Sequence, residues 1–323
     1  MKKRIGLFGF GCVAQGFYAG LQQNPEIDAE IVRICVKNPD KERLAPSDLF
    51  TTEAADIIAS QVDILVELID DAKAAKRIVV EGLKAGIPVI SANKKMIAEN
   101  LRELVQLQQE TQTPFLYEGA VAGSIPILYN LDQFFSTQSI SAIRGILNGS
   151  TNYILTKMKL NEIGYEDALD EAQALGFAES DPALDVEGTD AAYKTAILGF
   201  HAFGQFVDPA SIEKEGIDKL TANQILDSRK ENHKLKLVCS IDLHNDQLSA
   251  SVKPELVSES DALYAVDYEY NAISVNGNLS GIQTYVGKGA GSHPTGSAVL
   301  SDLNLLLSGF SYNYLSKVEV PIL

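Results

Sequence analysis

Short apolar runs alternate with longer amphipathic runs through the first 130 residues, and this alternation limits the possible folds more than any other feature. The apolar runs predict buried strands at residues 4–8, 31–36, 63–69, 88–90 and 115–117. The amphipathic runs predict helices at residues 13–22, 73–85 and 95–111. Strands that alternate with helices form right-handed βαβ units, so residues 1–130 are expected to form an α/β domain with a parallel, Rossmann-type sheet.

The pattern changes after residue 131, where strands and helices are grouped rather than alternating. Strands are expected at residues 139–147, 235–242, 247–252, 272–275 and 282–286, and helices at 153–160, 165–175 and 191–203. This mixture predicts a second, α+β domain over residues 131–291, with one face of its sheet covered by helices. A last apolar helix is expected at residues 295–307, and the segment 292–323 is expected to pack back on the first domain.

Composition and cysteine usage exclude some classes of partner. The chain has 43 acidic against 27 basic residues, a net charge of −16, which argues against nucleic acid or an anionic membrane as a partner. It offers no uninterrupted apolar run of about 18 residues, the length that a membrane span requires. Cys12, Cys35 and Cys239 are odd in number and widely separated. They indicate reduced thiols, and hence a cytoplasmic protein.

A glycine turn joins the first expected strand to the first expected helix. Gly9 permits a tight turn, and Gly11 lets backbone N–H groups approach a pyrophosphate at the start of the helix. This context, strand then glycines then helix, favours a dinucleotide-binding turn. An ordinary glycine turn between the two elements is the alternative.

Two lysines are candidates for the same crevice. Lys37 follows the second strand, where an NAD-binding site would place a carboxylate, so NADP(H) is favoured as cofactor and NAD(H) remains possible. Lys37 could instead be a solvated strand end. The block Ser91-Ala92-Asn93-Lys94 lies at the carboxyl edge of the expected sheet, where ligands bind in open parallel sheets. The alternative for Lys94 is an ordinary residue at the start of a helix.

The run from Glu179 to Lys194 places five carboxylates in front of one lysine. A carboxylate-rich loop suits a pocket for a small cationic molecule, and Asp190 lies one helical turn before Lys194 on the same face. The alternative is an acidic loop that caps a helix, with Lys194 reaching out to water. Taken alone, the run favours this alternative.

Six blocks in the same order resemble homoserine dehydrogenases along nearly the whole chain. They are the Gly9-x-Gly11 turn, residues 91–94, 117–126 (Tyr-Glu-Gly-Ala-Val-Ala-Gly-Ser-Ile-Pro), 145–154 (Gly-Ile-Leu-Asn-Gly-Ser-Thr-Asn-Tyr-Ile), 179–194 and 289–295 (Gly-Ala-Gly-Ser-His-Pro-Thr). The resemblance implies a Rossmann-type domain joined to a catalytic and dimerisation domain, in a homodimer or homotetramer. It also implies reversible NAD(P)H-dependent reduction of L-aspartate 4-semialdehyde to L-homoserine, in threonine and methionine biosynthesis.

The resemblance implies a role for each matched residue. Lys194 and Lys94 would be active-site lysines, with Asp190 orienting Lys194. The amino-acid substrate would be held by Glu179, Asp185, Gly149 and Ser150. The cofactor would contact Gly9, Phe10, Gly11, Cys12, Val13, Lys37, Ser91, Lys94 and Gly289. A sodium ion would be bound by Glu118 and by the carbonyls of Val121, Gly123 and Ile125, since carboxylate and carbonyl oxygens suit a hard cation.

Some positions depart from the family pattern. Asp70 and Asp71 stand where a glycine pair is usual, beside the expected nicotinamide ribose, and could weaken cofactor binding. Phe177 replaces a tyrosine often found before the Ala-Glu pair. The chain ends at Leu323, so it is expected to lack the regulatory ACT domain of many homologues. An aspartate dehydrogenase and a catalytically silent NADP-binding sensor remain as alternatives, although the 148–150 and 179–194 blocks and the two lysines argue against them.

Overall fold

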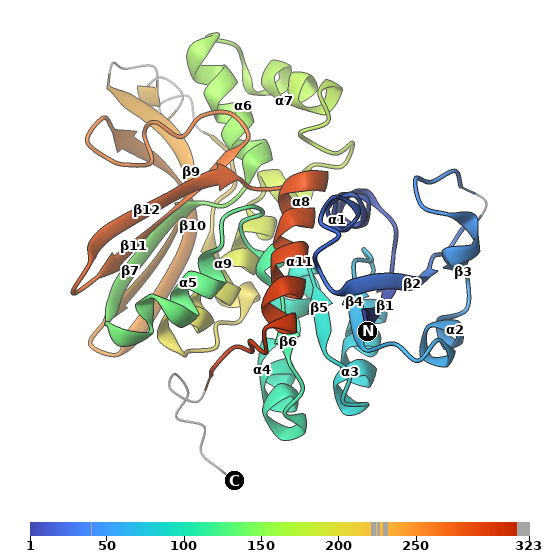
Figure 1. Cartoon of the computed structure of the whole chain (residues 1–323). Helices are drawn as coiled ribbons and strands as arrows, with labels where there is room; N and C mark the ends of the chain where they lie inside the picture. The colour runs from blue at the N-terminus through green and yellow to red at the C-terminus, as the bar shows by residue number, and fades with distance from the viewer. Residues whose placement is uncertain (40, 221–223, 225–226, 229–231, 315–323) are drawn as a thin grey trace. The chain divides into compact units, whose positions relative to one another are not determined.

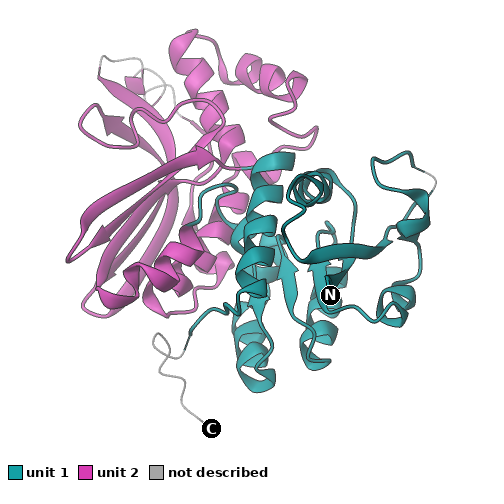
Figure 2. Cartoon of the chain, viewed as in Figure 1, with its two compact units in different colours: residues 1–126, 290–316 teal, residues 127–289, 317–323 magenta. Residues whose placement is uncertain are grey.

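The chain forms two compact units in a computed structural model (Figures 1 and 2). The structure describes residues 1–314, except residue 40 and residues 221–223, 225–226 and 229–231. Unit 1 consists of residues 1–126 and of the segment that begins at Ala290, and unit 2 consists of residues 127–289. Each unit is described by itself.

The described part of unit 1 contains a six-stranded parallel sheet. Its order is β3 (Phe50–Thr51), β2 (Ala29–Cys35), β1 (Lys3–Phe8), β4 (Ile64–Glu67), β5 (Val89–Ser91) and β6 (Phe115–Leu116). The sheet grows from β1 first toward β2 and β3, and then on the other side toward β4. The strand order therefore reverses between β1 and β4, and open α/β sheets bind ligands at the carboxyl ends of the strands at such a reversal. The predicted α/β class is confirmed.

Capping side chains and a glycine mark the ends of two helices in unit 1. They are α1 (Cys12–Gln23), α2 (Ala54–Ala59), α3 (Ala72–Lys84), α4 (Lys94–Thr111) and α11 (Ser292–Leu307), with short 3-10 turns η1 (Ser47–Leu49) and η2 (Glu118–Ala120). Asp71 and Asn93 cap α3 and α4, because each side chain accepts backbone N–H bonds from the first turn. Gly86 follows α3 with φ of 72°, a left-handed conformation that suits glycine.

The last helix packs within unit 1. Helix α11 lies against α1 at a distance that only glycines allow, since a β-carbon on Gly296 would lie 2.5 Å from the backbone nitrogen of Phe17. The helix ends at Leu307 rather than continuing through the segment, and Gly309 follows with φ of 85°. Beyond it, the Tyr314 hydroxyl pairs with that of Tyr117 at 2.8 Å. Residues 315–323 lie outside the described part of the chain.

Unit 2 contains a six-stranded sheet that is antiparallel except for its last pair. Its order among the described residues is β12 (Gly281–Lys288), β11 (Tyr270–Gly277), β7 (Ile140–Ile146), β9 (His233–His244), β10 (Gln247–Ser258) and β8 (Glu213–Lys214), and β8 runs parallel to β10. Asn245 and Asp246, both with positive φ, form the two-residue turn between β9 and β10. Strand β10 continues past its expected end at residue 252. Pro254 does not interrupt it, because β8 pairs only with Ser251 and Val252 and leaves that edge of β10 unpaired at Pro254.

Two described helices of unit 2 pack directly on this sheet: α6 (Gly149–Leu160) on β9 and β11, and α9 (Thr189–Phe203) on β9 and β10. The other described helices are α5 (Ile127–Gln133), α7 (Tyr165–Ala174) and α8 (Ala183–Val186), with 3-10 turns η3 (Phe135–Thr137) and η4 (Pro209–Ser211). Helix α6 begins four residues earlier than expected because Asn148 caps it. Residues 235–239 of β9 are all buried. Since alternate strand residues point to opposite faces, both faces are covered there, not only the one expected.

No described helix has both the length and the apolar character that crossing a bilayer demands.

Candidate active site

The turn after β1 has the geometry that an anion-binding turn requires. Gly9 has φ of 88°, and a β-carbon there would lie 2.5 Å from the Leu68 carbonyl oxygen, so only glycine fits. A β-carbon on Gly11 would meet nothing within 4 Å. Because Gly11 is also the N-cap of α1, no side chain caps the first turn of this helix. The turn therefore fits the pyrophosphate of a dinucleotide.

Three expected cofactor-contact residues follow Gly9 in this turn, and they differ in exposure. Phe10 is buried and packs edge-on against Tyr18 and Phe50, with ring centroids 5.7 and 5.3 Å apart. Cys12 is exposed, and Val13 is partly exposed. A contact from Phe10 to a ligand in the crevice would therefore come from its backbone.

Lys37, just after β2, and Asp71, at the start of α3, lie near enough in unit 1 for their charges to interact. Lys37 is exposed just beyond β2. The Asp71 carboxylate accepts the Lys73 and Ala74 N–H groups, both at 3.0 Å. The Ala74 N–H bond is the main cause that lowers the pKa of Asp71, and the charge of Lys37 adds to it. Asp71 thus caps α3, which accounts for one of the two unusual carboxylates.

The block from Ser91 to Lys94 is organised by a residue that sequence reasoning missed, Glu67. Ser91 Oγ donates to Glu67 Oε2 at 2.6 Å, and both side chains are fully buried. The Ile69 N–H donates to the other carboxylate oxygen at 2.7 Å. Burial raises the pKa of Glu67 to about 7. A carboxylate in an otherwise apolar strand was the available signal for this residue.

Lys94 is the first residue of α4 and is partly exposed at the carboxyl edge of the sheet. The preceding Asn93 fixes this point, because its side chain donates to the Ile69 carbonyl at 2.9 Å and accepts the Met96 N–H at 3.0 Å. Ser91 in turn accepts the Asn93 N–H at 3.1 Å. The loops after β4 and β5 are therefore tied together around the start of α4.

The expected cation ligands form a tight turn after β6. Glu118 is 3% exposed, and its N–H donates to Asp302 Oδ2 at 2.9 Å. Burial, together with the nearby charge of Glu118, raises the pKa of Asp302 well above its usual range. Val121, Gly123 and Ile125 follow, and Gly123 bends the chain with φ of 57°. No three His, Cys, Asp or Glu side chains of the described residues form a metal-binding group, so a cation here would need carbonyl ligands too.

In unit 2, Lys194 and Asp190 form a buried ion pair on α9. Lys194 Nζ lies 2.8 Å from Asp190 Oδ2, and the two residues are 6% and 3% exposed. Lys194 Nζ also donates to the Leu147 carbonyl at 2.7 Å, at the end of β7. The i, i+4 spacing on one helix face accounts for the pair. The alternative, a lysine that reaches out to water, does not hold, because Lys194 is buried and paired.

Asn148 joins three parts of this site and was missed as a site residue. Its Nδ2 donates to Asp190 Oδ2 at 2.9 Å and to Asp185 Oδ1 at 2.7 Å. Its Oδ1 accepts the Thr151 N–H at 2.9 Å and so caps α6. The Asn-Gly-Ser block was recognised in the sequence, but only the fold brings Asn148 to the carboxylates.

The other residues expected to bind the substrate are Gly149, Ser150 and Glu179, and they differ in exposure and in contacts. Gly149 begins α6, and a β-carbon there would lie 2.7 Å from the Glu269 carbonyl oxygen, so the close approach requires glycine. Ser150 Oγ donates to the Phe177 carbonyl at 2.6 Å. Glu179 is exposed, and its backbone carbonyl accepts a bond from Gln173. The structure therefore brings together Asp185, Asp190 and Lys194 around Asn148, with Gly149 and Ser150 next to them in the chain.

Gly289 is the last residue of the 127–289 segment of unit 2, and it lies against the buried side chain of Asn271. A β-carbon on Gly289 would lie 2.1 Å from the Cγ and Nδ2 atoms of Asn271. The lysines Lys94 and Lys194 belong to unit 1 and unit 2, respectively.

Comparisons with known proteins agree over both units. The family model described as "Homoserine dehydrogenase, NAD binding domain" matches residues 9–118, and the one described as "Homoserine dehydrogenase" matches residues 126–304. The homoserine dehydrogenase of Bacillus subtilis is 37% identical over 310 residues, which cover 93% of this chain and 72% of that protein. That of Neisseria gonorrhoeae is 35% identical over 308 residues, covering 93% and 71%.

Solved structures give the same result. A homoserine dehydrogenase from Thiobacillus denitrificans superposes with a TM-score of 0.92 at 32% identity, covering all of this chain and 80% of that one. A hyperthermophilic archaeal homoserine dehydrogenase in complex with NADPH superposes with a TM-score of 0.83 at 26% identity, covering 97% and 99%.

Proposed function

Since this chain belongs to the homoserine dehydrogenase family, we propose that it interconverts L-aspartate 4-semialdehyde and L-homoserine with Lys194 as the group that moves the proton. The observation that supports this role best is the buried Lys194–Asp190 pair, at 2.8 Å on one face of α9. A buried ammonium needs partners in place of water, and Lys194, which is 6% exposed, has the Asp190 carboxylate and the Leu147 carbonyl, so its Nζ is held at a fixed point beside the Asn148-Gly149-Ser150 block.

The chemistry explains why a held ammonium is needed. The nicotinamide cofactor, when bound, supplies or accepts the hydride. Reduction of the aldehyde leaves negative charge on its oxygen, and the Lys194 ammonium stabilises that charge and donates a proton to the oxygen. In the reverse direction Lys194 takes the hydroxyl proton of homoserine. Asp190 and the Leu147 carbonyl keep Nζ in one position, so little reorganisation accompanies the proton transfer.

The amino-acid part of the substrate has one ammonium and one carboxylate, and we assign a partner to each. Asp185 and Glu179 bind the ammonium. The start of α6 binds the carboxylate through the N–H groups of Gly149 and Ser150, where the helix dipole favours an anion. Because the Ser150 hydroxyl already donates to Phe177, the backbone of Ser150 is the better donor.

The cofactor is a nicotinamide dinucleotide, and we propose a preference for NADP(H). Lys37 follows β2 without a carboxylate beside it to bind ribose hydroxyls. The Asp71 carboxylate accepts N–H bonds from the first turn of α3, and the positive end of the helix dipole partly offsets the repulsion between Asp71 and a cofactor phosphate. We assign Phe10, Gly11, Cys12 and Val13 to the pyrophosphate turn and Lys94 to the nicotinamide end, and we propose Ser91 and Gly289 as further cofactor contacts.

A structural sodium ion is also proposed, bound by Glu118 and by the carbonyls of Val121, Gly123 and Ile125. A carboxylate that is 3% exposed beside a left-handed turn at Gly123 supports a small oxygen-lined site.

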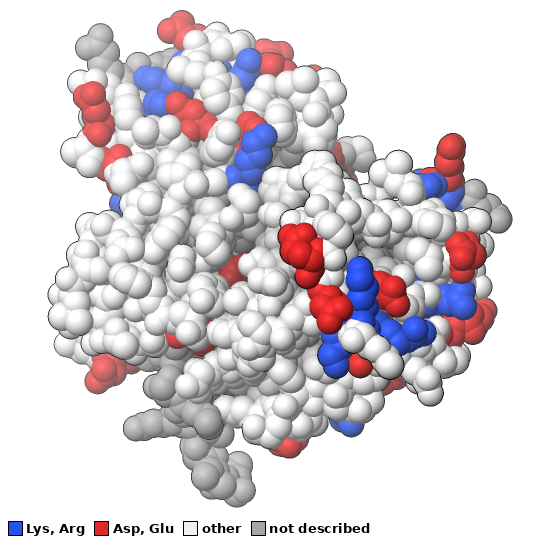
Figure 3. Space-filling model, in the orientation of Figure 1, with Lys and Arg blue, Asp and Glu red and all other residues white. Residues whose placement is uncertain are grey.

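Exposed apolar residues and surface charge indicate which macromolecules this chain binds. We propose a homodimer or homotetramer, because Leu279, Ile282 and Val286 are exposed at and beside the edge strand β12. On the face shown in Figure 3, basic side chains occur in small groups with acidic neighbours. We propose no nucleic-acid partner because the net charge is −16. Free cysteines throughout the described chain support a cytoplasmic location.

The test is a homoserine-dependent assay with NADP⁺ and with NAD⁺ at mildly alkaline pH. We expect activity with both and a higher kcat/KM with NADP⁺. Lys37→Asp should reverse or abolish that preference, because a carboxylate repels the 2′-phosphate. Absence of homoserine-dependent activity with either dinucleotide would overturn the proposed function. An unchanged preference in Lys37→Asp would overturn only the role of Lys37.

A further inference from the structure

Asn271 is a buried side chain whose polar atoms have no partner among the residues that the structure describes. It is 0% exposed, and neither Nδ2 nor Oδ1 makes a hydrogen bond. A buried amide without partners costs free energy, so such groups are rare in folded proteins and frequently have a functional reason.

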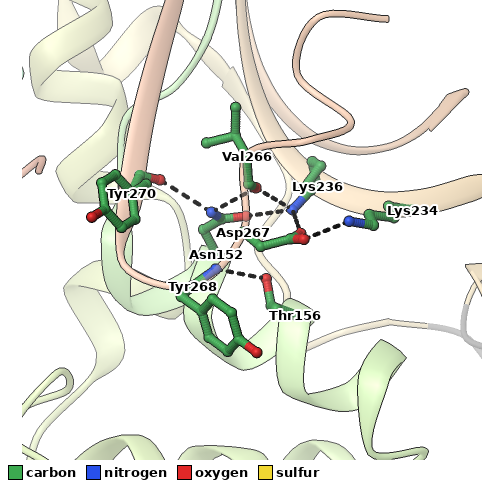
Figure 4. A network of polar contacts seen from close by, with 8 residues as sticks. All are labelled: Asn152, Thr156, Lys234, Lys236, Val266, Asp267, Tyr268 and Tyr270. Carbon is green, nitrogen blue, oxygen red and sulfur yellow. Dashed lines mark hydrogen bonds and ion pairs between the residues drawn. The ribbon is translucent and has the colours of Figure 1, made fainter. Parts of the chain in front are cut away.

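The backbone just before Asn271 is held by hydrogen bonds, and Figure 4 shows those made by Tyr270 and its neighbours. The Tyr270 carbonyl, just before it, accepts from Asn152 Nδ2 at 3.1 Å. Asn152 in turn accepts from Lys236 Nζ at 3.0 Å, and Lys236, itself 1% exposed, also binds the Val266 carbonyl and Asp267. These contacts tie the chain before Asn271 to α6 and β9. Asn271 therefore lacks partners because of its position, not because its surroundings are loose.

The carboxamide faces a glycine segment, Gly287–Gly291, in which three of five residues are glycine. Gly287 pairs with Asn271 across β12 and β11, and a β-carbon on Gly289 would lie 2.1 Å from the carboxamide nitrogen. Gly289 must therefore be glycine to leave room for the Asn271 side chain. It is also the last residue of unit 2 before the chain enters unit 1. Glycines give this segment the freedom to adjust its backbone.

Asn271 lies on the same face of the sheet as the Lys194 site. It is two residues from Ile273, which is paired with Gly145, and Gly145 is paired with Cys239. The Cys239 thiol forms a hydrogen bond with Thr195 of α9, and the charges of Lys194 and Asp190 act on it. A preorganised amide is thus placed between the reactive helix and the glycine segment.

We propose that Asn271 is a positioning residue for the bound dinucleotide, whose carboxamide hydrogen-bonds the backbone of Gly287–Gly291 when that segment takes its place against the cofactor. The proposal rests on the proposed contact between Gly289 and the dinucleotide. Donor and acceptor side by side match the alternating N–H and C=O groups of a peptide backbone. The bonds that Asn271 lacks in the free protein are made on binding, so they add to cofactor affinity.

The first test compares two buried asparagines of unit 2 by thermal unfolding without cofactor. Asn271→Leu replaces an unbonded amide with an apolar side chain of similar size, so the Tm should stay within about 1 °C of wild type or rise. Asn152→Leu removes an acceptor from the buried Lys236 and two donated bonds, so the Tm should fall by roughly 5 °C or more. Equal losses of Tm in both variants would show that Asn271 is already bonded in the free protein, and would overturn the proposal.

The second test measures the response to NADPH. In Asn271→Leu the rise of Tm caused by NADPH should shrink, and KM for NADPH should increase about tenfold with a smaller change in kcat. Asn271→Ala, which only removes atoms, serves if the leucine variant does not fold. Unchanged KM and unchanged NADPH response would overturn the proposal. The Tm response needs no catalysis, so it remains informative even if homoserine-dependent activity is not found.

Discussion

In the part of the chain that the structure describes, Lys194 has two acceptors for its three ammonium protons, the Asp190 carboxylate and the Leu147 carbonyl. Among the described residues nothing accepts the third proton, and we propose that a substrate oxygen does. Asp190 also accepts from Asn148, so the carboxylate is oriented by two donors. From this arrangement we expect Asp190 to affect rate rather than substrate affinity.

We therefore expect Asp190→Asn to lower kcat about 10²-fold while KM for homoserine changes little, because the amide leaves Lys194 without its counter-charge. Steady-state kinetics of homoserine oxidation measures both quantities. Glu187→Gln, an exposed carboxylate of the same acidic run, should behave as wild type. A rise of KM with unchanged kcat in Asp190→Asn would assign Asp190 to substrate binding instead.

Glu67 gives a prediction on pH. Its folded-state pKa is about 7, above the ordinary 4.5, so between these values the folded protein binds more protons than the unfolded chain. The free energy of unfolding contributed by Glu67 therefore falls as pH rises from about 4.5 to about 7. Glu67→Gln cannot ionise, so its Tm relative to wild type should increase from pH 5 to pH 8.

Thermal unfolding at several pH values tests this sign, with Glu81→Gln on the exposed side of α3 as control. A constant difference in Tm between Glu67→Gln and wild type would mean that Glu67 ionises alike in both states.

Single residues differ in how far the sequence could identify them. The Lys194–Asp190 pair was predictable because one helix fixes the distance between i and i+4 side chains. The contacts of Asn148 and Glu67 were not predictable, because their partners are distant in sequence. The partners of Asn148 lie 37 and 42 residues away, and Ser91, the partner of Glu67, lies 24 residues away. Only the fold decides which distant groups meet.

At the scale of elements, the contact between α1 and α11 carries a strong steric requirement. A side chain at Gly296 would meet the backbone of Gly16 and Phe17, which cannot move aside as a side chain can. We expect Gly296→Val to lower the Tm by roughly 5 °C or more. It should also weaken NADPH binding, since α1 begins at the pyrophosphate turn.

Differential scanning calorimetry with and without NADPH measures both effects. Ser297→Ala, at the exposed neighbouring position, is the matched control and should stay near wild type. A Gly296→Val protein with wild-type Tm would show that the two helices are not in backbone contact.

Element prediction succeeded where periodicity is strong and failed where it is interrupted. The strands and helices of the first 120 residues follow from alternation alone, apart from the short β3 and α2. The start of α6 was placed too late because Asn148-Gly149-Ser150 has low helix propensity, and capping by Asn148 overrides it. Helix α5 begins directly after Pro126, as a proline that starts a helix indicates, although its seven residues give little periodic signal.

At the scale of the whole molecule, the exposed apolar side chains of β12 predict self-association. Ile282 and Val286 are 69% and 55% exposed on the outer strand of the sheet. We expect Ile282→Asp with Val286→Asp to reduce the mass measured by light scattering to that of one chain, because buried charges oppose the interface. An oligomer of unchanged mass in the double variant would exclude this edge from the interface.

The family was also predictable, because six separated blocks recur in one order. The boundaries of the site were harder to predict, since the glycine segment and Asn271 are adjacent only through the pairing of β11 with β12.

The most direct test of the account is kcat for homoserine oxidation by Lys194→Ala at saturating NADP⁺, beside wild type and Glu187→Gln. We predict that Lys194→Ala loses about 10²- to 10⁴-fold in kcat while it still binds NADPH, because only the proton transfer is removed. Glu187→Gln should keep wild-type kcat. A folded Lys194→Ala protein with kcat close to that of wild type would contradict the central claim that Lys194 moves the proton.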